Sequence, residues 1–290
     1  MPTRFLKGHG LGNDYLALEL EGLEFDLTPA AVRLLCDRHR GIGSDGILGR
    51  VATGAADFGL RIFNPDGSEA EKSGNGLRIF ARYLLGRGEV AVGRRFSVET
   101  PGGIVRMVVL DWRDDSATVE VEMGRASFRS AAVGLPGPDR DIDGEMLELE
   151  AGDRVSINTV SIGNPHCVIF EDEVDVEDLR RRAPQISVHP WFERGTNVQF
   201  ARAVEADAVE AWVWERGAGE TSASGSSACA VAAAAVRRGL VSSRDVEVRM
   251  PGGTLEVHVG EQWDIVLRGP VEAVYEGELV EEMVDRLRSL

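Results

Sequence analysis

The chain has 290 residues, of which 43% are hydrophobic and 28% are charged. These are ordinary values for a folded globular protein, and a chain of this length normally divides into two domains. The net charge of −16 argues against nucleic acid and anionic membranes as partners, because both bind basic patches.

The cysteines are few and widely spaced. Cys36, Cys167 and Cys229 form an odd set without a CxxC spacing, which indicates neither a disulfide framework nor a zinc site. We therefore predict no metal site. The N-terminal segment lacks the apolar core of a signal peptide, and no apolar run reaches membrane-spanning length. A cytoplasmic location is expected.

The first residues predict a strand, a tight turn at 9–14 and a second strand at 15–20. Thr28 is placed to cap a helix over 29–38, because Pro29 suits the first helical position. A polar turn then leads to a strand at 47–51, and a strand at 57–63 leads to a loop that ends at Ser73.

The next segment, 76–86, is nearly apolar on every side apart from Arg78 and Arg82. A helix of that kind belongs inside a domain, so we expect strands to wrap around it. Residues 95–121 predict a β-meander around a Pro-Gly-Gly turn. The proline-containing acidic stretch at 125–152 is interpreted as the connector between two halves.

Similar elements follow in the second part of the chain. The pattern predicts two strands broken by a tight turn over 158–170, a charged surface helix at 175–182, and a strand at 209–214. A polar loop at 215–227 then enters an Ala-rich helical segment. The remaining predicted elements are a second Pro-Gly-Gly hairpin at 246–259, a strand at 262–267, a turn at Gly269-Pro270 and a terminal helix at 280–290.

The two parts of the chain repeat each other at a nearly constant offset. Ser73 aligns with Ser224 at an offset of 151 (224 minus 73), and the same offset places Asn13 on Asn164. An offset of 150 places the first Pro-Gly-Gly turn, which begins at Pro101, on the second. A period this long indicates two similar halves rather than a solenoid array.

Each half contains Ser and Gly residues directly before a helix. Free backbone N–H groups and the helix dipole attract anions at such a position. Taken singly, however, a Ser/Gly stretch is more often an ordinary N-cap. The duplication favours a functional role for both.

Several motifs in this order resemble the signature of the diaminopimelate epimerase family. They are His-Gly-Leu-Gly-Asn-Asp at 9–14, Phe-Asn-Pro-Asp-Gly-Ser-Glu at 63–69, Gly-Asn-Gly at 74–76, Gly-Asn-Pro-His-Cys at 163–167, and Glu-Arg-Gly-Ala-Gly-Glu-Thr at 215–221. The resemblance covers essentially the whole chain. It implies an α/β (α+β) fold with two pseudo-symmetric halves, each a curved mixed β-sheet wrapped around a central helix, and an active site in the cleft between them. It also returns the C-terminal segment to the first half, so the expected domains are 1–118 plus 270–290 and 119–269.

The resemblance further implies a cofactor-independent isomerase that converts L,L- to meso-diaminopimelate in lysine biosynthesis. Inversion at Cα without pyridoxal phosphate needs one group to remove a proton on one face and another to return a proton on the opposite face. In the family two cysteines do this, each directly before the Gly that begins its helix. Here both positions are serine, Ser73 and Ser224. A hydroxyl is a far weaker acid than a thiol and needs an adjacent base.

Three explanations for the serines remain open. The first is a deliberate Cys→Ser replacement made to trap substrate. The second is a natural divergent branch that uses the serines with a base such as His166 or Glu215, on this or another amino acid. The third is a natural relative that binds an amino acid without catalysis. A pure scaffold protein, which would have no polar cleft, belongs to a further class. The drift of flanking residues such as Ser226 and Ser227 from the family's commonest forms favours natural divergence.

The resemblance assigns a binding role to a larger set of residues. The predicted catalytic group is Ser73, Ser224, His166 and Glu215, and the predicted substrate-binding group is Asn13, Asn64, Gly74, Asn75, Asn164, Asn197, Arg216, Gly225 and Ser226. Amides accept from an ammonium group and donate to a carboxylate, and arginine binds carboxylates bidentately. Each asparagine alone is equally well explained by a turn, His166 by a satisfied buried histidine, and Glu215 by an ion pair with Arg216.

We therefore expect an amino-acid epimerase with an altered acid/base pair and no cofactor. A catalytically weak or inactive binding relative is the alternative. The expected partner is a small diamino dicarboxylic acid, with no nucleic acid and no membrane. Family members often form homodimers, although no residue pattern here marks a dimer surface.

Overall fold

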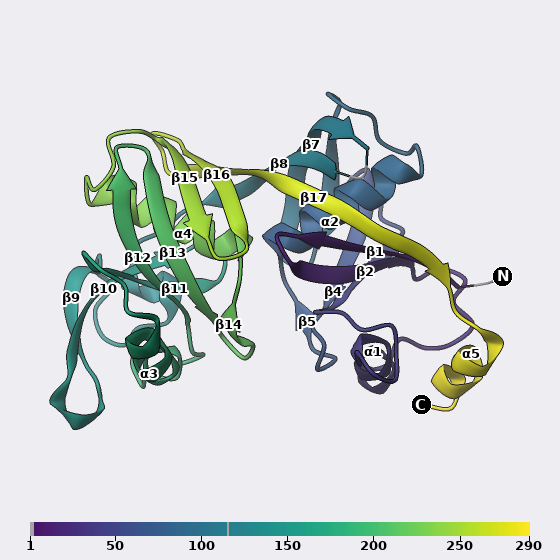
Figure 1. Ribbon diagram of the computed structural model, residues 1–290, viewed down its shortest axis with the longest axis horizontal. Helices are drawn as coiled ribbons and strands as arrows, with labels where there is room; N and C mark the ends of the chain where they lie inside the picture. Colours follow the sequence, from purple (N-terminus) through teal and green to yellow (C-terminus); the bar gives the residue numbers. More distant parts are fainter. Residues whose placement is uncertain (1–2, 115) are drawn as a thin grey trace. The chain divides into compact units, whose positions relative to one another are not determined.

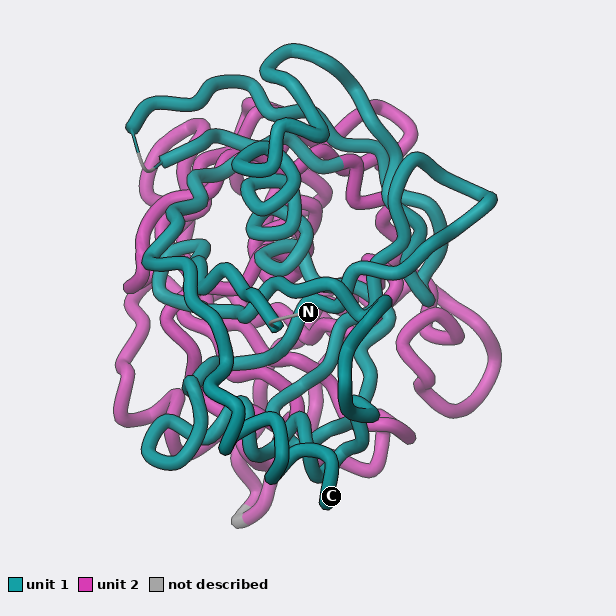
Figure 2. Tube along the Cα trace, turned by 90° about the vertical axis from the view of Figure 1, so that its right-hand side faces the viewer, with its two compact units in different colours: residues 1–121, 269–290 teal, residues 122–268 magenta. Residues whose placement is uncertain are grey.

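The computed structural model describes residues 3–114 and 116–290. The chain forms two compact units, one comprising Met1–Val121 with Gly269–Leu290 and the other Glu122–Arg268. Figure 2 colours these units, which are called the first and second half below. Among the described residues, no helix is both long and apolar enough to cross a membrane.

In the part of the chain that the structure describes, the first half contains a mixed sheet and three helices (Figure 1). Its elements are β1 (Arg4–Gly10), β2 (Asn13–Glu19), α1 (Pro29–Cys36), β3 (Ile47–Val51), β4 (Phe58–Phe63), β5 (Glu69–Ala70), α2 (Gly74–Gly86), β6 (Arg95–Thr100), β7 (Gly103–Arg113), β8 (Ser116–Arg125), the later part of β17 (Asp264–Glu278) and α5 (Glu281–Arg288). Neighbouring strands follow the order β17, β1, β2, β3, β4, β6, β7, β8, and β8 also pairs with β17. The β2–β3 and β4–β6 pairs are parallel.

Helix α2 is the buried centre of the first half. Every residue from Gly74 to Leu85 is buried, and the helix contacts β1, β2 and β7. The sequence-based prediction of a central helix is therefore confirmed, with one addition. Arg78 and Arg82, the two charged positions of this helix, are buried as well.

A second core lies under α1 and α5. Thr28 caps α1 as predicted, because its side chain accepts a hydrogen bond from the Ala31 N–H at 3.2 Å. Val284 and Leu287 of the C-terminal helix pack into the same cluster as residues of α1, β2 and β3. The last residues of the chain therefore complete the first half.

The second half has the same plan. Its elements are a 3-10 turn at Ser130–Val133, β9 (Asp143–Glu148), a 3-10 turn at Glu150–Gly152, β10 (Arg154–Ser161), β11 (Pro165–Phe170), α3 (Val176–Ser187), β12 (Asn197–Glu205), β13 (Ala208–Glu215), β14 (Gly219–Thr221), α4 (Gly225–Arg237), β15 (Asp245–Met250), β16 (Gly253–Val259) and the start of β17. The β11–β12 and β13–β15 pairs are parallel. Helix α4 contacts β10, β11, β12, β13, β15 and β16.

The duplication seen in the sequence extends to strand register. Leu16 pairs with Ile47 in the first half, and Cys167 pairs with Val198 in the second, each 151 residues later. Val98 pairs with Val105, and Val248 pairs with Leu255, each 150 residues later. The predicted pseudo-symmetric fold, a mixed sheet around a central helix in each half, is thus confirmed.

Two expectations about connecting segments are revised. Gly269-Pro270 does not turn the chain, because β17 runs without a break from Asp264 to Glu278. Arg268 is the last residue paired with β16 and Glu272 the first paired with β1, so Pro270 lies between these two ladders. The predicted connector at 125–152 also contains β9, which pairs with β10 and extends the second half's sheet.

Candidate active site

The N-terminus of α2 carries Ser73 at its N-cap. The residue is extended, with φ −140° and ψ 120°, and its Oγ accepts a hydrogen bond from the Gly76 N–H at 3.0 Å. The phenol oxygen of Tyr15 lies 3.4 Å from the same Oγ. Gly76 suits this position because a Cβ there would lie 3.3 Å from the Ser73 Oγ. Ser73 is therefore an ordinary N-cap residue, as expected for a single serine before a helix.

Two of the predicted binding residues meet beside this serine. Asn75, on the first turn of α2, is 3% exposed. Its Nδ2 donates to the Oδ1 of Asn13 at 3.1 Å. Asn13 lies at the β1–β2 turn, and its own Nδ2 donates to Asp45 at 3.0 Å. The turn and the helix N-terminus are therefore joined by side-chain amides.

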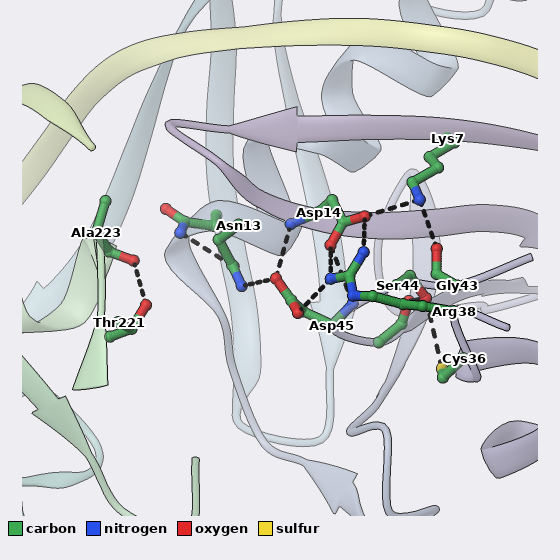
Figure 3. A network of polar contacts seen from close by, with 12 residues as sticks. Lys7, Asn13, Asp14, Cys36, Arg38, Gly43, Ser44, Asp45, Thr221 and Ala223 are labelled. Atoms are coloured by element: carbon green, nitrogen blue, oxygen red, sulfur yellow. Dashed lines mark hydrogen bonds and ion pairs between the residues drawn. The ribbon is translucent and has the colours of Figure 1, made fainter. Parts of the chain in front are cut away.

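Next to Asn13 lies a cluster of charged residues that the sequence did not predict (Figure 3). Its members are Lys7, Asp14, Arg38 and Asp45. Arg38 donates to both carboxylate oxygens of Asp14, at 2.7 and 3.1 Å, and to Asp45 at 2.8 Å. Lys7 lies 2.9 Å from Asp14. Burial raises the pKa of Asp14, but the hydrogen bonds from Arg38 and Lys7 more than offset this and hold that pKa at about 2. The pKa of Asp45 is raised, chiefly by burial.

Asn64 has local partners instead. It follows β4, and its Nδ2 donates to the Ser68 Oγ at 2.9 Å, while its backbone N–H donates to the Ser68 carbonyl at 2.8 Å. Gly67 N–H donates back to the Asn64 carbonyl at 2.9 Å. These contacts make Asn64 part of a tight turn. The structure does not link it to Asn13 or Asn75 within the described residues.

The N-terminus of α4 carries Ser224 at the equivalent N-cap. The backbone is again extended, with φ −146° and ψ 123°, but the Ser224 side chain makes no capping hydrogen bond. Ser224 is 4% exposed. Gly225 and Ser226 form the start of the helix, as the sequence predicted. The two N-caps thus share a backbone conformation and differ in what the hydroxyl contacts.

His166 lies on β11 and is fully buried. Its Nε2 lies 3.0 Å from Asn164 Oδ1, and its Nδ1 lies 3.1 Å from the Nε2 of Gln199. Gln199 also donates to the Ser227 hydroxyl at 2.9 Å. Burial lowers the pKa of His166 to about 3, the Gln199 hydrogen bond opposes this, and the charge of Arg216 adds to the lowering. His166 is therefore neutral at pH 7 and a weak base.

Three further predicted residues lie together near β12 and β13. Asn197 donates to the Pro165 carbonyl at 3.0 Å, and its Oδ1 accepts from the Arg216 N–H at 2.9 Å. Arg216 is exposed, and its guanidinium donates to the Arg194 carbonyl at 3.1 Å. Glu215 ends β13, where it pairs with Gly219. Asn164, His166, Asn197 and Arg216 thus form one connected group in the second half.

Sequence reasoning missed four residues that hold these groups in place. They are Tyr15, Asp45, Arg78 and Gln199. The offset of 151 would have found one of them, since it places Tyr15 on His166. Asp45 and Gln199 contact residues that are distant in sequence, so no local pattern marks them. Arg78 contacts Asn75 and Gly74 on its own helix.

Comparison with known proteins addresses the family of this chain. The family model described as diaminopimelate epimerase matches residues 5–129 and 158–274. A relative named diaminopimelate epimerase 2, from Nostoc sp. (strain PCC 7120 / SAG 25.82 / UTEX 2576), is 45% identical over 281 residues, which cover 97% of this chain and 96% of the relative. Diaminopimelate epimerase from Desulforudis audaxviator (strain MP104C) is 41% identical over 280 residues, with 95% and 99% coverage.

Solved structures with low sequence identity share the fold. A probable proline racemase from Agrobacterium radiobacter K84 has a TM-score of 0.70 at 17% identity, covering 96% of this chain and 93% of that one. A hydroxyproline epimerase from Agrobacterium vitis has a TM-score of 0.69 at 17% identity, with 96% and 90% coverage. From the family match and the near full-length relatives, we conclude that this chain belongs to the diaminopimelate epimerase family.

Proposed function

We propose that this protein is a cofactor-independent epimerase that binds a diaminopimelate-type amino acid and exchanges its Cα proton slowly, within lysine biosynthesis. The observation that carries the proposal is the matched pair of helix N-termini. Each half has a serine at the N-cap of a buried central helix. Each half also has an asparagine turn, Asn13 in the first and Asn164 in the second, at the same offset of 151. The names of the 45% and 41% identical relatives support the substrate class.

The proposed chemistry assigns one proton-transfer group to each half. When one group removes the Cα proton, the electron pair of the broken C–H bond delocalises onto the adjacent carboxylate. Backbone N–H groups at the start of α2 and α4, around Gly74, Asn75, Gly225 and Ser226, are the proposed donors to that carboxylate. The other group then returns a proton on the opposite face, which inverts the centre.

The weak step is removal of the proton by a serine. For a hydroxyl to accept the Cα proton, its own proton must first pass to a base. Ser73 has Tyr15 as its side-chain neighbour, and a phenol has a pKa near 10. His166, one of the two candidate bases that the sequence analysis named, is engaged by Asn164 and Gln199 and has a pKa of about 3. We therefore assign His166 to positioning Asn164 and not to proton removal.

The surroundings of the two serines also favour a second candidate, an amino-acid-binding relative without turnover. Within residues 3–114 and 116–290, neither serine hydroxyl is hydrogen-bonded to a carboxylate or an imidazole. The predicted binding residues of the second half are held by hydrogen bonds, Asn164 to His166 and Asn197 to both Pro165 and Arg216, and they need no base. Binding would therefore persist where proton transfer fails.

Deuterium incorporation at Cα of L,L- and meso-diaminopimelate in heavy water tests both candidates. The test compares the unchanged protein with Ser73→Cys/Ser224→Cys, and a matched control, Ser242→Cys/Ser289→Cys, adds two exposed thiols away from the N-termini of α2 and α4. Each thiolate at a helix N-terminus is a competent acid/base group. We expect the Ser73/Ser224 cysteine variant to incorporate label at least about a hundredfold faster than the unchanged protein.

Each outcome decides between the candidates. Measurable label with the unchanged protein supports the slow epimerase, and label with the Ser73/Ser224 cysteine variant alone supports the binding relative. If neither protein incorporates label, the diaminopimelate assignment is wrong. Faster exchange in the control variant would show that added thiols act without the site.

A further inference from the structure

Arg78 is a fully buried cation one helical turn inside α2. It is 0% exposed. Its Nη2 donates to the Asn75 Oδ1 at 2.8 Å, and its Nη1 is 3.3 Å from the Gly74 carbonyl. Burying a guanidinium is costly unless its hydrogen bonds are well directed. A charged side chain on the exposed face of a helix needs no explanation. A fully buried guanidinium below the N-terminus of a central helix requires one.

The hydrogen bonds continue from Arg78 as a directed chain. Asn75 Nδ2 donates to Asn13 Oδ1 at 3.1 Å, and Asn13 Nδ2 donates to the Asp45 carboxylate at 3.0 Å. Every amide oxygen therefore faces the cationic end of the chain, and every amide nitrogen faces the anionic end. Chains of this kind polarise each other in a buried environment.

The charges at the two ends fix the orientation of both amides. If the amides rotated by half a turn, the Asn75 NH₂ would face the Arg78 guanidinium and the Asn13 oxygen would face the Asp45 carboxylate. Both contacts would be repulsive, because guanidinium only donates and an ionised carboxylate only accepts. Arg78 and Asp45 therefore select one of two amide orientations, although neither is itself at the helix N-cap.

The backbone makes room for this chain in the first half alone. A Cβ on Gly10 would lie 2.8 Å from Arg78 Nη2, so the glycine at the end of β1 admits the guanidinium. At the offset of 151, the second half has Ser226, Cys229 and Thr196 in place of Asn75, Arg78 and Asp45. The pseudo-symmetric half thus keeps the helix and lacks both charged ends.

We propose that Arg78 and Asp45 are positioning residues, which hold the amides of Asn13 and Asn75 in the one orientation that binds the substrate. This inference rests on the proposed function for its substrate. The buried cation also adds to the positive potential at the N-terminus of α2, where the reacting carboxylate is proposed to bind.

Binding of meso-diaminopimelate, followed by calorimetry, tests the role of Arg78. Arg78→Met keeps the length of the side chain and removes the charge, and we expect it to weaken binding about tenfold or more. Arg78→Lys keeps the charge without the fork and should recover part of that loss. Arg82→Met is the control, since Arg82 is 9% exposed on the same helix and contacts Trp112. Binding by Arg82→Met should equal that of the unchanged protein.

A double-variant cycle separates positioning from structural support. If Arg78 acts through Asn75, the effect of Arg78→Met on the dissociation constant disappears in an Asn75→Ala background. A role confined to stability would lower the melting temperature and leave the dissociation constant of the folded protein unchanged. An undiminished effect in the Asn75→Ala background would overturn the inference.

A second measurement does not depend on the substrate. In a ¹⁵N–¹H correlation spectrum, Asn13→Ala identifies the side-chain NH₂ signals of Asn13 by their loss. Arg78→Met should shift these signals, although no hydrogen bond joins Arg78 to Asn13 in the described residues, and Arg82→Met should not. Unmoved Asn13 signals overturn the positioning role. Failure of the unchanged protein to bind diaminopimelate instead overturns the proposed function, and the spectrum still decides the first question.

Discussion

The N-termini of α2 and α4 occupy the same place in a duplicated fold and have different surroundings. Ser73 is partly exposed, and its hydroxyl accepts a helix N–H beside a cluster of charged residues. Ser224 is buried, and its side chain makes no capping hydrogen bond. In that half, Gln199 contacts His166 and the hydroxyl of Ser227, so this hydrogen-bonded group is uncharged. Backbone register therefore persists between the halves while the electrostatics differ. Since a strand ladder depends on backbone groups, side chains behind it are free to diverge.

The largest expected difference concerns the charge cluster of the first half. Asp14→Asn leaves Arg38 and Lys7 without their shared carboxylate, because Asp14 accepts from both. We expect a loss of about 3 kcal/mol in the free energy of unfolding at pH 7. Urea denaturation measures this loss.

The second half supplies the control for that experiment. Thr196 is the counterpart of Asp45, and among the described residues its hydroxyl donates only to the neighbouring Asn197 carbonyl, at 3.1 Å. Thr196→Val should therefore lower the free energy of unfolding by no more than about 1 kcal/mol. Equal losses from Asp14→Asn and Thr196→Val would contradict the proposed electrostatic difference.

An intermediate effect is expected from the buried histidine of the second half. The pKa of His166 is lowered from 6.5 to about 3 on folding, so the unfolded chain binds the proton more tightly. The stabilisation is complete above about pH 6.5 and is lost as the pH falls toward the folded pKa. Between pH 7 and pH 5 we expect a loss of about 2 kcal/mol in the free energy of unfolding.

His166→Gln removes the titrating group and should remove this loss. Comparison of urea denaturation at both pH values isolates the contribution of His166, because the other histidines are common to both proteins. If the variant loses as much stability as the unchanged protein between pH 7 and pH 5, His166 is not the group that titrates.

The smallest expected difference lies at the two N-caps. Ser73→Ala removes the acceptor of the Gly76 N–H and should lower the free energy of unfolding by about 1 kcal/mol. Ser224→Ala removes no capping hydrogen bond and should change it by less than about 0.5 kcal/mol. Thermal or urea unfolding of the two variants, measured side by side, gives the comparison. A larger loss at Ser224 would reverse it.

The elements with strong local signals were predictable from sequence. Pro-Gly-Gly fixed the β6–β7 and β15–β16 hairpins, because few other residues allow so tight a turn. The nearly apolar run at 76–86 and the Ala-rich segment after the polar loop at 215–227 identified α2 and α4 to within a few residues. Prediction failed at Pro270, where proline suggested a turn, and at β9, where acidic residues and prolines nearby masked a short edge strand.

The candidate site was predictable only in part, for a related reason. The sequence singled out both serines, and it singled out Asn164, which contacts His166, and Asn197, which accepts from the Arg216 N–H. It did not reveal that Arg38 would reach Asp14, or that Gln199 would engage His166. Arg38 lies in the turn after α1, and Gln199 lies on a strand that pairs with the strand of His166. Both pairs join segments that are distant in sequence, and no local spacing encodes them. The assigned roles of the site residues stay proposals.

The return of the C-terminal segment to the first half bears on how the chain is made. The closing strand of that half is the later part of β17, which pairs with β1 from Arg4↔Glu278 to His9↔Glu272. On a ribosome, β1 can pair with β2 at once, but its other edge lacks its partner until β17 is synthesised, more than 260 residues later. The second half is one continuous segment, Glu122–Arg268, so all of it is synthesised before that edge of β1 can be paired. We expect the second half to complete its fold first, and the open edge of β1 to depend on chaperones in the interval.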